Sequence, residues 1–564
     1  MKRESSHLAE MPLLPALSRS RAVSPILGWW KPNGTPPSTK HDDIRGALLR
    51  IHQPLTIVEK EGQLALGTGG DARLGKEHKI DASLPIAGYA SACPLQQLGD
   101  SAFCDEHRIQ YPYVSGSMAN GIASEEIVEA MANAGMLGFF GSAGLPPERV
   151  EAAIDRLLRS LDDKPFGFNL IHSPNEPELE AAVVDLYLKR GVKLVEASAY
   201  LGLTLPVVKY RVKGIHRDSN GRVVTPSKII AKVSRVEVAT RFLSPPPEKY
   251  LNELVQLGEI TQEQAEMAAE IPMAQDLTAE ADSGGHTDNR PALSLLPSML
   301  ALSERIQEQY GYENRLRVGA AGGLSTPASM AAAFAMGAAY VVVGSVNQSC
   351  VESGSSDNVR KMLAWAEQAD VAMAPAADMF EMGVKVQVLK RGTMFAMRAQ
   401  KLFDLYKAHS SLEELSDVDR NMLEKQFFKS SLDEVWQSTR SYFQSRDVEQ
   451  LERAERDPKH RMALVFRSYL GQSSRWANSG DPSRVVDYQV WCGPAMGAFN
   501  EWVKGSFLEP PENRTVEVVA RNLLYGAALT LRMNTLRQQG IRLQGDVARV
   551  RPFETEELDL YLGA

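Results

Sequence analysis

Between residues 109 and 350 the chain alternates short apolar runs with longer stretches in which apolar residues recur every three to four positions. Short apolar runs are typical of buried parallel strands, and the second spacing is typical of helices that pack through one face. Eight strands are predicted, at 112–115, 137–140, 165–170, 193–196, 228–233, 275–281, 316–321 and 339–343. Repeated strand–helix units of this number predict an α/β fold, the TIM (β/α)8 barrel.

The last two predicted strands each end in glycine. Gly322-Gly323 follows the first of them and Gly344-Ser345 the second, with a helix between them that begins at Ser325 or Thr326. Parallel strands deliver both glycine turns to one edge of the barrel, where bare amide groups suit a phosphate. The alternative is two tight turns in an α/β core. Glycine at both places, where close backbone approach is needed, favours the phosphate site.

The regions around this barrel follow other patterns. Residues 1–48 are rich in Pro, Ser and Gly and are predicted to form a flexible arm with an exposed Trp29-Trp30 pair. Residues 49–108 read as a small β-rich region, and 245–272 as a two-helix insertion before the sixth strand. Residues 351–564 are predicted to be mainly helical, as a substrate lid or a dimer interface.

One glycine pattern in the β-rich region needs a separate interpretation. Gly67, Gly69 and Ala72 match the loose dinucleotide fingerprint G-x-G-x-x-A. The segment that follows, RLGKEHK, is polar and not an amphipathic helix, so the strand-to-helix context of the fingerprint is missing. We therefore interpret it as a turn.

Composition narrows the classes of partner. The 564 residues carry a formal net charge of -8, which argues against nucleic acid as the main partner. The longest apolar run, Met330 to Gly344, is short for a membrane span and is broken by Gly337. The four cysteines have no metal-ligand spacing, and no secretory signal is evident, so no metal site and a cytoplasmic location are expected.

Polar and glycine residues gather directly after the predicted strands, where TIM barrels carry their chemistry. The candidates are Ser117, Met118, Ala119, Asn169, Glu196, Lys232, Ser283, Gly284, Gly285, His286, Ala321, Gly322, Gly323, Gly344 and Ser345. Each has a structural alternative: Asn169 as a loop cap, Glu196 with Lys232 as a buried pair, and His286 as a brace for its glycine loop. Their convergence on one barrel mouth favours a functional site.

A single phosphate site, a flat mouth and the lack of a dinucleotide loop suggest flavin mononucleotide (FMN). The phosphate is expected on the Gly322 and Gly344 turns. The backbone of 117–119 and Asn169 are expected to face the flavin ring.

Several motifs also resemble a known superfamily. PYVSGSMANG, KPFGFN, ADSGGHTD and AAGGLSTPASMAAAFAMGAAYVVVGS are similar to segments of FMN-dependent nitronate monooxygenases and bacterial enoyl reductases. The longer ADSGGHTDNRP form, the helical insertion and NLLYGAALTLRMNTLRQQGI resemble the PfaD family. Members of that family are enoyl reductases of polyunsaturated fatty acid synthases and of some polyketide synthases. The resemblance runs from about Leu55 to the end of the chain.

The resemblance implies a trans-acting reductase that uses NADPH or NADH through FMN to reduce 2-enoyl thioesters on acyl carrier protein. His286 matches the family loop whose histidine faces the flavin, so it is the candidate for polarising or protonating the substrate, with solvent as the alternative proton source. Lys232 is a candidate charge partner for the flavin ring or thioester, because a lysine inside a barrel is costly without a task. Glu196 is its candidate counter-ion.

The resemblance also implies a homodimer, and a cluster of Trp491, Phe499 and Trp502 supports that expectation. Two other functions stay open from the barrel motifs: an FMN oxidase or oxygenase acting on nitronates, and the equivalent reductase of a polyketide synthase. A non-catalytic scaffold would predict degraded glycine turns, whereas Gly322, Gly323 and Gly344 are all present.

Overall fold

The computed structural model describes residues 16–19, 26–174, 177–444 and 447–563. The chain forms two compact units, one made of residues 1–98 with 522–564 and the other of residues 99–521.

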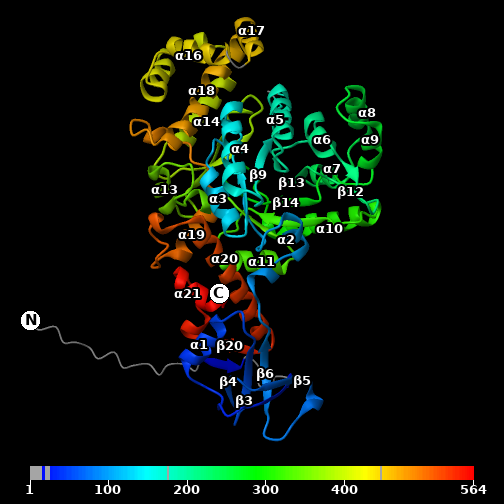
Figure 1. The fold of residues 1–564 in the computed structure, drawn as a ribbon. Helices are drawn as coiled ribbons and strands as arrows, with labels where there is room; N and C mark the ends of the chain where they lie inside the picture. Colours follow the sequence, from blue (N-terminus) through cyan, green and yellow to red (C-terminus); the bar gives the residue numbers. More distant parts are fainter. Residues whose placement is uncertain (1–15, 20–25, 175–176, 445–446, 564) are drawn as a thin grey trace, which may run out of the picture. The chain divides into compact units, whose positions relative to one another are not determined.

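The larger unit is built on a closed barrel of eight parallel strands (Figure 1). The strands are β7 (Tyr113–Ser115), β8 (Leu137–Phe140), β9 (Gly167–Ile171), β10 (Leu194–Ser198), β13 (Lys228–Val233), β14 (Asp276–Glu280), β16 (Arg317–Ala321) and β17 (Val341–Val343). They pair in that order, and β17 closes on β7. The TIM barrel is therefore confirmed, and each strand lies within or overlaps the range predicted for it.

Helices follow the strands around the outside of the barrel (Figure 1). They are α3 (Glu125–Asn133), α4 (Pro147–Leu161), α5 (Pro177–Arg190), α6 (Leu205–Val212), α7 (Val236–Leu243), α10 (Ala292–Tyr310), α11 (Pro327–Ala335) and α12 (Ser345–Gln348). Thr326, not Ser325, caps α11: its hydroxyl accepts from Ser329 N in a reciprocal capping box. The predicted insertion is confirmed as α8 (Glu248–Gln256) and α9 (Gln262–Ala268). Smaller elements are α2 (Ser101–His107) and the ribbon of β11 (His216–Arg217) and β12 (Val223–Val224).

Beyond the barrel the chain forms more than helices. β18 (Val371–Pro375) and β19 (Lys385–Leu389) pair antiparallel, and β15 (Gly285–His286) from the loop after β14 adds to β19. The sequence predicted 351–564 to be mainly helical and did not predict these strands. The apolar runs of β18 and β19 are short and follow polar turns. The same pattern occurs at the ends of helices, so periodicity alone does not identify these strands.

The remaining elements of this unit are helical. They are α13 (Asp357–Ala364), α14 (Phe395–Ala408), η3 (Leu412–Glu414), α15 (Asp417–Met422), the π-helical η4 (Leu423–Phe428), α16 (Leu432–Gln444), α17 (Val448–Arg456), α18 (Pro458–Ser479), η5 (Val485–Asp487), α19 (Ala495–Val503) and η6 (Pro511–Asn513). Helix α20 (Val516–Gln538) begins in this unit and ends in the other. Phe380, Phe466 and Leu470 belong to one buried cluster that joins the β18–β19 sheet to α14 and α18.

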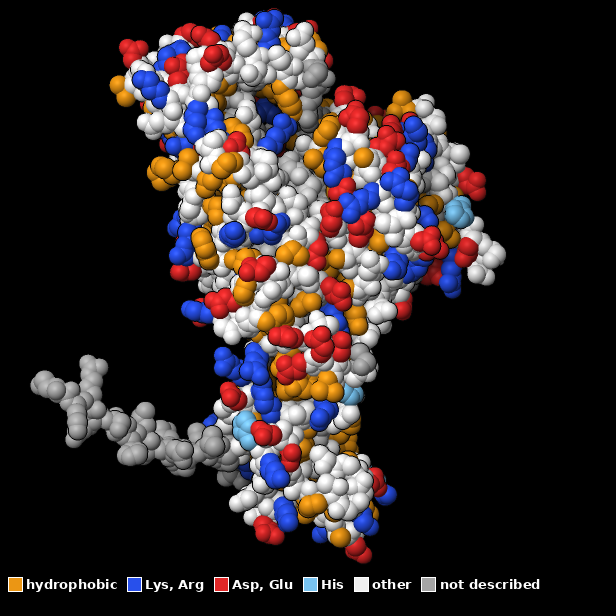
Figure 2. Space-filling view, turned by 60° about the vertical axis from the view of Figure 1, so that its left-hand side comes forward, with side chains coloured by type: hydrophobic (Ala, Val, Ile, Leu, Met, Phe, Trp, Pro, Cys, Tyr) orange, Lys and Arg blue, Asp and Glu red, His pale blue; other side chains and the backbone are white. Residues whose placement is uncertain are grey.

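Charged side chains of both signs are interspersed on the face of the molecule drawn in Figure 2. That face shows no continuous basic tract of the kind that nucleic acid requires. Within the described residues, no helix is both long enough and apolar enough to cross a membrane.

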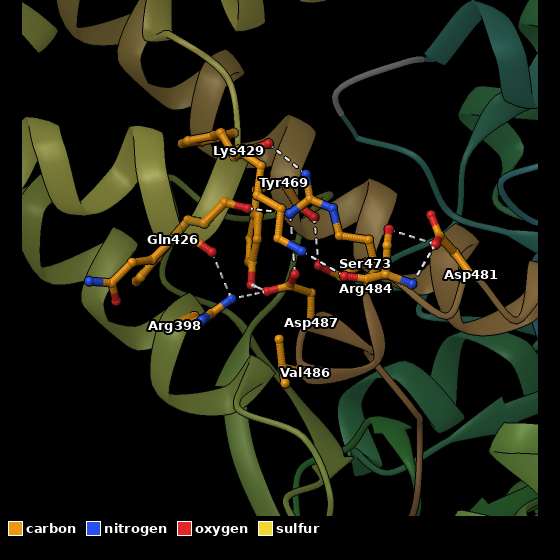
Figure 3. Close-up of polar contacts among 12 residues, drawn as sticks. Arg398, Gln426, Lys429, Tyr469, Ser473, Asp481, Arg484, Val486 and Asp487 are labelled. Atoms are coloured by element: carbon orange, nitrogen blue, oxygen red, sulfur yellow. Dashed lines mark hydrogen bonds and ion pairs between the residues drawn. The ribbon is translucent and has the colours of Figure 1, made fainter.

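A buried carboxylate organises the helices near η4 (Figure 3). The Asp487 side chain is fully buried, and it pairs with Arg398 from α14 and with Arg484 at 3.2 Å (Nη1 to Oδ2). Tyr469 of α18 donates its hydroxyl to Asp487 Oδ1 at 2.7 Å. Arg398 also donates to the carbonyl of Gln426 at 3.0 Å, so the network satisfies a carbonyl group near the end of η4 as well.

The smaller unit centres on a five-stranded antiparallel sheet in the order β4–β3–β6–β2–β5. Its elements are β1 (Leu17–Arg19), β2 (Gly28–Lys31), α1 (His41–Leu49), β3 (Leu55–Lys60), β4 (Gln63–Gly67), β5 (Asp71–Leu74), η1 (Lys76–His78), β6 (Leu84–Ala90), η2 (Leu95–Gln97), β20 (Ile541–Leu543), η7 (Gly545–Ala548) and α21 (Thr555–Leu562). The fingerprint-like segment is the turn between β4 and β5, so a strand follows it where the fingerprint requires an α-helix, as interpreted from the sequence.

Two expectations about this unit are wrong. Residues 28–48 were expected in an arm, yet they supply β2 and most of α1, and Trp30 is 1% exposed. The indole lies against the β4–β5 turn, where a Cβ on Gly67 would stand 3.0 Å from it and one on Gly70 only 2.4 Å. The last 43 residues were grouped with the C-terminal helices, but 522–564 belong with the first 98 residues.

Candidate active site

A cavity of ≈ 1030 Å³ opens at the carboxyl ends of the barrel strands. Of the residues selected from the sequence, those that line it are Ser117, Met118, Ala119, Asn169, Lys232, Ser283, Gly284, Gly285, His286, Ala321, Gly322, Gly323, Gly344 and Ser345. The strand-end rule for TIM barrels therefore brings almost the whole predicted set to one place.

Glu196 is the exception, because it is fully buried and does not line the cavity. Its Oε2 accepts a hydrogen bond from Ser117 N at 3.0 Å and another from Ser117 Oγ. Asn169 Nδ2 donates to the same Ser117 Oγ at 2.9 Å and to Ser198 Oγ at 3.1 Å. Glu196 thus supports the cavity floor from below instead of facing a ligand. Among the described residues, nothing hydrogen-bonds its buried Oε1.

Lys232 lies between two carboxylates. Its Nζ is 3.6 Å from Glu196 Oε2 and 3.5 Å from Glu280 Oε1, and its side chain is 14% exposed. Burial lowers the pKa of Lys232, but the charges of Glu196 and Glu280 outweigh it and hold the pKa above the usual value. Burial raises the pKa of Glu280 in spite of Lys232. The lysine therefore stays cationic at the cavity wall.

His286 reaches the cavity on the short strand β15, which pairs with β19 (His286 opposite Val386). Its Nε2 lies 3.2 Å from Asp378 Oδ1. Burial lowers the pKa of His286, but the carboxylate of Asp378 outweighs burial, so the net pKa is above the usual value. Asp378 was not found from the sequence, because it lies 92 residues further along in a stretch with no motif.

The two glycine turns leave backbone open to the cavity. Gly322 has a φ of +80°, and a Cβ there would stand 2.6 Å from the carbonyl carbon and oxygen of Ala281, so only glycine fits. A Cβ on Gly323 or Gly344 would meet nothing within 4 Å. Since β16 and β17 are paired neighbours, these open amides lie side by side, as an anion site requires.

The glycine loop before His286 is held by residues from the C-terminal half of the unit. Gln387 Nε2 donates to Asp282 Oδ1 and to Ser283 O, both at 2.8 Å. A Cβ on Gly284 would stand 2.9 Å from Cys492 N, so this loop and the 492–493 backbone are in close contact. Sequence reasoning missed these contacts, which join segments more than 100 residues apart.

Residues of α16 and α18 form the outer wall of the cavity. They include Thr439, Phe443, Leu464, Ser468 and Gln472. Asn120, in the loop after β7, donates its amide to Ser474 Oγ of α18 at 3.0 Å. Of the aromatic residues expected at a dimer interface, Trp491 lines the cavity and Phe499 is fully buried. Trp502 is half-buried and packs on Phe499, with ring centroids 5.8 Å apart.

His172, Glu180 and Tyr200 also line the cavity and were missed. His172 stands two residues past the predicted end of the third strand. Including the first residues of each loop in the strand-end search would have found it.

An eight-stranded parallel barrel with open glycine turns, a charged lysine and a carboxylate-paired histidine in one cavity defines a TIM-barrel enzyme. The family model described as nitronate monooxygenase matches residues 100–423, more than half of the chain. The chain therefore belongs to the nitronate monooxygenase family. A second model, the inserted helical domain of acyl-carrier-protein S-malonyltransferase, matches residues 409–488.

The chain is 45% identical over 514 residues to a polyunsaturated fatty acid synthase subunit of Thraustochytrium sp., covering 90% of this chain and 34% of that protein. It is 42% identical over 501 residues to the polyketide biosynthesis protein PksE of Bacillus subtilis, covering 88% of this chain and 63% of PksE. The chain thus spans between a third and two thirds of the length of these relatives.

Among solved structures, the enoyl reductase domain of MlnA from the macrolactin biosynthesis cluster of Bacillus amyloliquefaciens is 39% identical. The match has a TM-score of 0.75 and covers 78% of this chain and 99% of that domain. These similarities confirm the resemblance to enoyl reductases of fatty acid and polyketide synthases that the motifs indicated.

Proposed function

We propose that the chain is an FMN-dependent enoyl reductase that uses NADPH or NADH to reduce 2-enoyl thioesters carried on acyl carrier protein. The observation that carries this proposal is the likeness to the MlnA enoyl reductase domain over 99% of that domain. The Thraustochytrium relative supports a role in the biosynthesis of polyunsaturated fatty acids. That the chain acts in trans is what its resemblance to PfaD proteins implies. The four free cysteines favour a reducing, cytoplasmic setting.

The cavity residues fit FMN. The open amides at Gly323 and Gly344 suit its phosphate, and the 117–119 backbone with Asn169 forms a polar floor for its ring. The cation of Lys232 suits the electron-rich edge of the ring or the thioester oxygen. Bound FMN supplies hydride transfer from the nicotinamide cofactor to the β-carbon of the enoyl group.

His286 is suited to donate a hydrogen bond to the substrate carbonyl. With Asp378 beside it, its pKa lies above the usual value, which favours the protonated ring near neutral pH. A protonated ring can donate a hydrogen bond to the thioester oxygen or release a proton to the substrate, and solvent is the alternative proton source. Residues of α16 and α18 form the outer wall of the cavity. We expect this wall to contact the acyl chain and to act as its lid.

A second candidate is oxidation of nitronates with O₂, which the family match over residues 100–423 favours. The two reactions share the flavin site and differ in the electron acceptor. The match to PksE equally supports a polyketide synthase as the source of the enoyl thioester.

The test is a visible spectrum of the FMN-loaded protein under anaerobic conditions. We expect NADPH to bleach the flavin and crotonyl-CoA, or a crotonyl carrier protein, to restore its colour. Recovery with O₂ or a nitroalkane alone would replace the reductase with the nitronate oxidase. Absence of flavin binding after FMN is added would contradict both candidates.

A further inference from the structure

A second histidine lines the cavity on the loop after β9. The backbone N–H of His172 donates to Ser198 O at 3.1 Å, which anchors this loop to the end of β10. The His172 ring stacks on Tyr200, with ring centroids 5.2 Å apart and an interplanar angle of 22°. Both side chains line the cavity, and His172 is 16% exposed. Neither residue is needed for the roles of Lys232 and His286.

A buried carboxylate holds this histidine. Glu180, at the start of α5, has a side chain 2% exposed, and its Oε2 lies 3.3 Å from His172 Nδ1. Its Oε1 accepts hydrogen bonds from Tyr200 Oη at 2.9 Å and from Thr204 Oγ1. Burial, together with the charge of Glu180, raises the pKa of Tyr200 well above its usual value, so the phenol remains a donor.

These contacts determine which nitrogen of His172 carries a proton. An ionised carboxylate only accepts hydrogen bonds, so the Nδ1 that faces Glu180 must carry hydrogen. Nε2, the nitrogen further from the backbone, is then the one left for a substrate. Among the described residues, none forms a hydrogen bond with Nε2. A histidine oriented by a carboxylate, with its other nitrogen available, is the usual arrangement of an acid–base group.

His286 is arranged differently. Its Nε2 is engaged by Asp378, and the two side chains are 32% and 47% exposed. The His172–Glu180 pair is 16% and 2% exposed. The His172–Glu180 pair is therefore better shielded from water and has its outer nitrogen available. Shielding limits proton exchange with solvent, so this pair is the better placed to deliver a proton to a substrate.

We propose that His172, oriented by Glu180, is a catalytic residue of this cavity and supplies the proton taken up by the α-carbon of the enoyl thioester. This assignment rests on the proposed reductase function. It leaves His286 to donate a hydrogen bond to the thioester carbonyl, and it makes Glu180 a positioning residue.

Electrons and protons balance in this step. Bound reduced FMN would supply a hydride, with its two electrons, to the β-carbon. The π electrons of the carbon–carbon double bond form a new bond at the α-carbon to the proton of His172 Nε2. His172 becomes neutral, keeps the Nδ1 proton that it donates in a hydrogen bond to Glu180, and regains the Nε2 proton from solvent.

The first experiment compares His172→Gln with wild type and with His216→Gln. His216 is an exposed histidine on β11, outside the cavity, so it serves as the matched control. All three FMN-loaded proteins should be bleached by NADPH at similar rates. We expect recolouring by crotonyl-CoA to slow about 10²-fold or more in His172→Gln and to stay unchanged in His216→Gln.

The outcomes separate this assignment from the proposed function. If wild type is bleached but crotonyl-CoA does not restore its colour, the reductase function fails and this assignment fails with it. If wild type is recoloured and His172→Gln is recoloured within about threefold of its rate, only the assignment to His172 fails. Normal bleaching of His172→Gln shows that the variant is folded and binds FMN.

A second readout does not depend on turnover. Diethyl pyrocarbonate acylates accessible neutral imidazoles, and mass spectrometry reports the reaction at each histidine. We expect butyryl-CoA, a saturated product-like thioester, to slow modification of His172 about tenfold and to leave His216 unaffected. Equal modification of His172 with and without butyryl-CoA would contradict contact with the substrate.

The role of Glu180 is tested by Glu180→Gln. We expect slow recolouring with normal bleaching, and loss of the low-field Nδ1 proton signal of His172 in spectra of protein carrying nitrogen-labelled histidine. A purely structural role for Glu180 would instead lower flavin binding and bleaching together. Glu180→Gln with a wild-type recolouring rate would contradict the positioning role.

Discussion

Lys232 shows how one side chain can serve both the stability and the chemistry of a barrel. Two carboxylates, Glu196 and Glu280, lie within 3.6 Å of its amine, and Glu196 is completely buried. An uncompensated buried carboxylate is costly, so the lysine is needed to keep both acids in place. Because its amine also lines the cavity, the same cation is available to a ligand.

We therefore expect Lys232→Met to lower the free energy of unfolding of the cofactor-free protein by about 3 kcal/mol and to abolish flavin-dependent reduction. The physical reason is that Glu196 and Glu280 would face each other without a cation. Urea unfolding followed by tryptophan fluorescence measures the change. Lys213→Met, which removes an exposed lysine paired with Glu259, is the control and should change stability by about 0.5 kcal/mol or less. Equal midpoints for the two variants would contradict this role of Lys232.

The glycine turns after β16 and β17 differ in why they need glycine. Gly322 is constrained by its positive φ and by the Ala281 backbone, whereas Gly344 has an ordinary negative φ and open space around it. The open space around Gly344 therefore favours a ligand, and not a neighbouring protein atom, as the reason for glycine at this position.

From this difference we expect Gly344→Ala to keep the stability of the cofactor-free protein and to weaken FMN binding about tenfold, because its methyl group would occupy the space of the phosphate. Gly322→Ala should instead lower stability by more than about 1 kcal/mol even without FMN. Thermal unfolding and fluorescence titration with FMN measure the two effects. Unchanged FMN affinity in Gly344→Ala would contradict the prediction that the phosphate binds at this turn.

The elements of the outer wall depend on the buried network around Asp487 (Figure 3). Arg398, Tyr469 and Arg484 converge on one carboxylate, and both arginines also bond carbonyl groups of η4. The network thereby joins η4, α14, α18 and η5, and α18 in turn lines the cavity.

We expect Asp487→Asn to destabilise this helical region by about 3 kcal/mol, because two nearly buried guanidinium groups would lose their shared counter-ion. Hydrogen exchange of α14 and α18 should increase, whereas that of the barrel strands should not. The control is Asp481→Asn, because among the described residues the Asp481 carboxylate accepts hydrogen bonds only from N and Oγ of the nearby Ser483. Loss of protection spread evenly over the barrel would show that the network is not local to these helices.

The molecule as a whole combines a barrel unit with a separate unit assembled from both ends of the chain. The resemblance to PfaD proteins implies a homodimer, which we retain as a prediction. Light scattering coupled to size-exclusion chromatography should then report twice the 62.0 kDa of one chain. A mass equal to one chain at micromolar concentration would contradict it.

Most of the barrel could be predicted because its information is local. The strands at 137–140 and 228–233 were predicted at their observed bounds, because a buried strand is a run of consecutive apolar residues. The cavity residues from Ser117 to Ser345 followed from the same pattern, because parallel strands of a barrel end at one edge. The motif around His286 added the family and its chemistry.

Contacts between distant segments were decided by the tertiary structure. Asp378 meets His286 only because β15 pairs with β19, and Trp30 is buried only because glycines of the β4–β5 turn leave room for its ring. The C-terminal residues from 522 onward join the first 98 in the same way. Periodicity records which face of an element is apolar and does not record which partner covers that face. The repeating strands and helices could therefore be predicted from the sequence, whereas the partners of His286, Asp487 and Trp30 depend on how those elements pack.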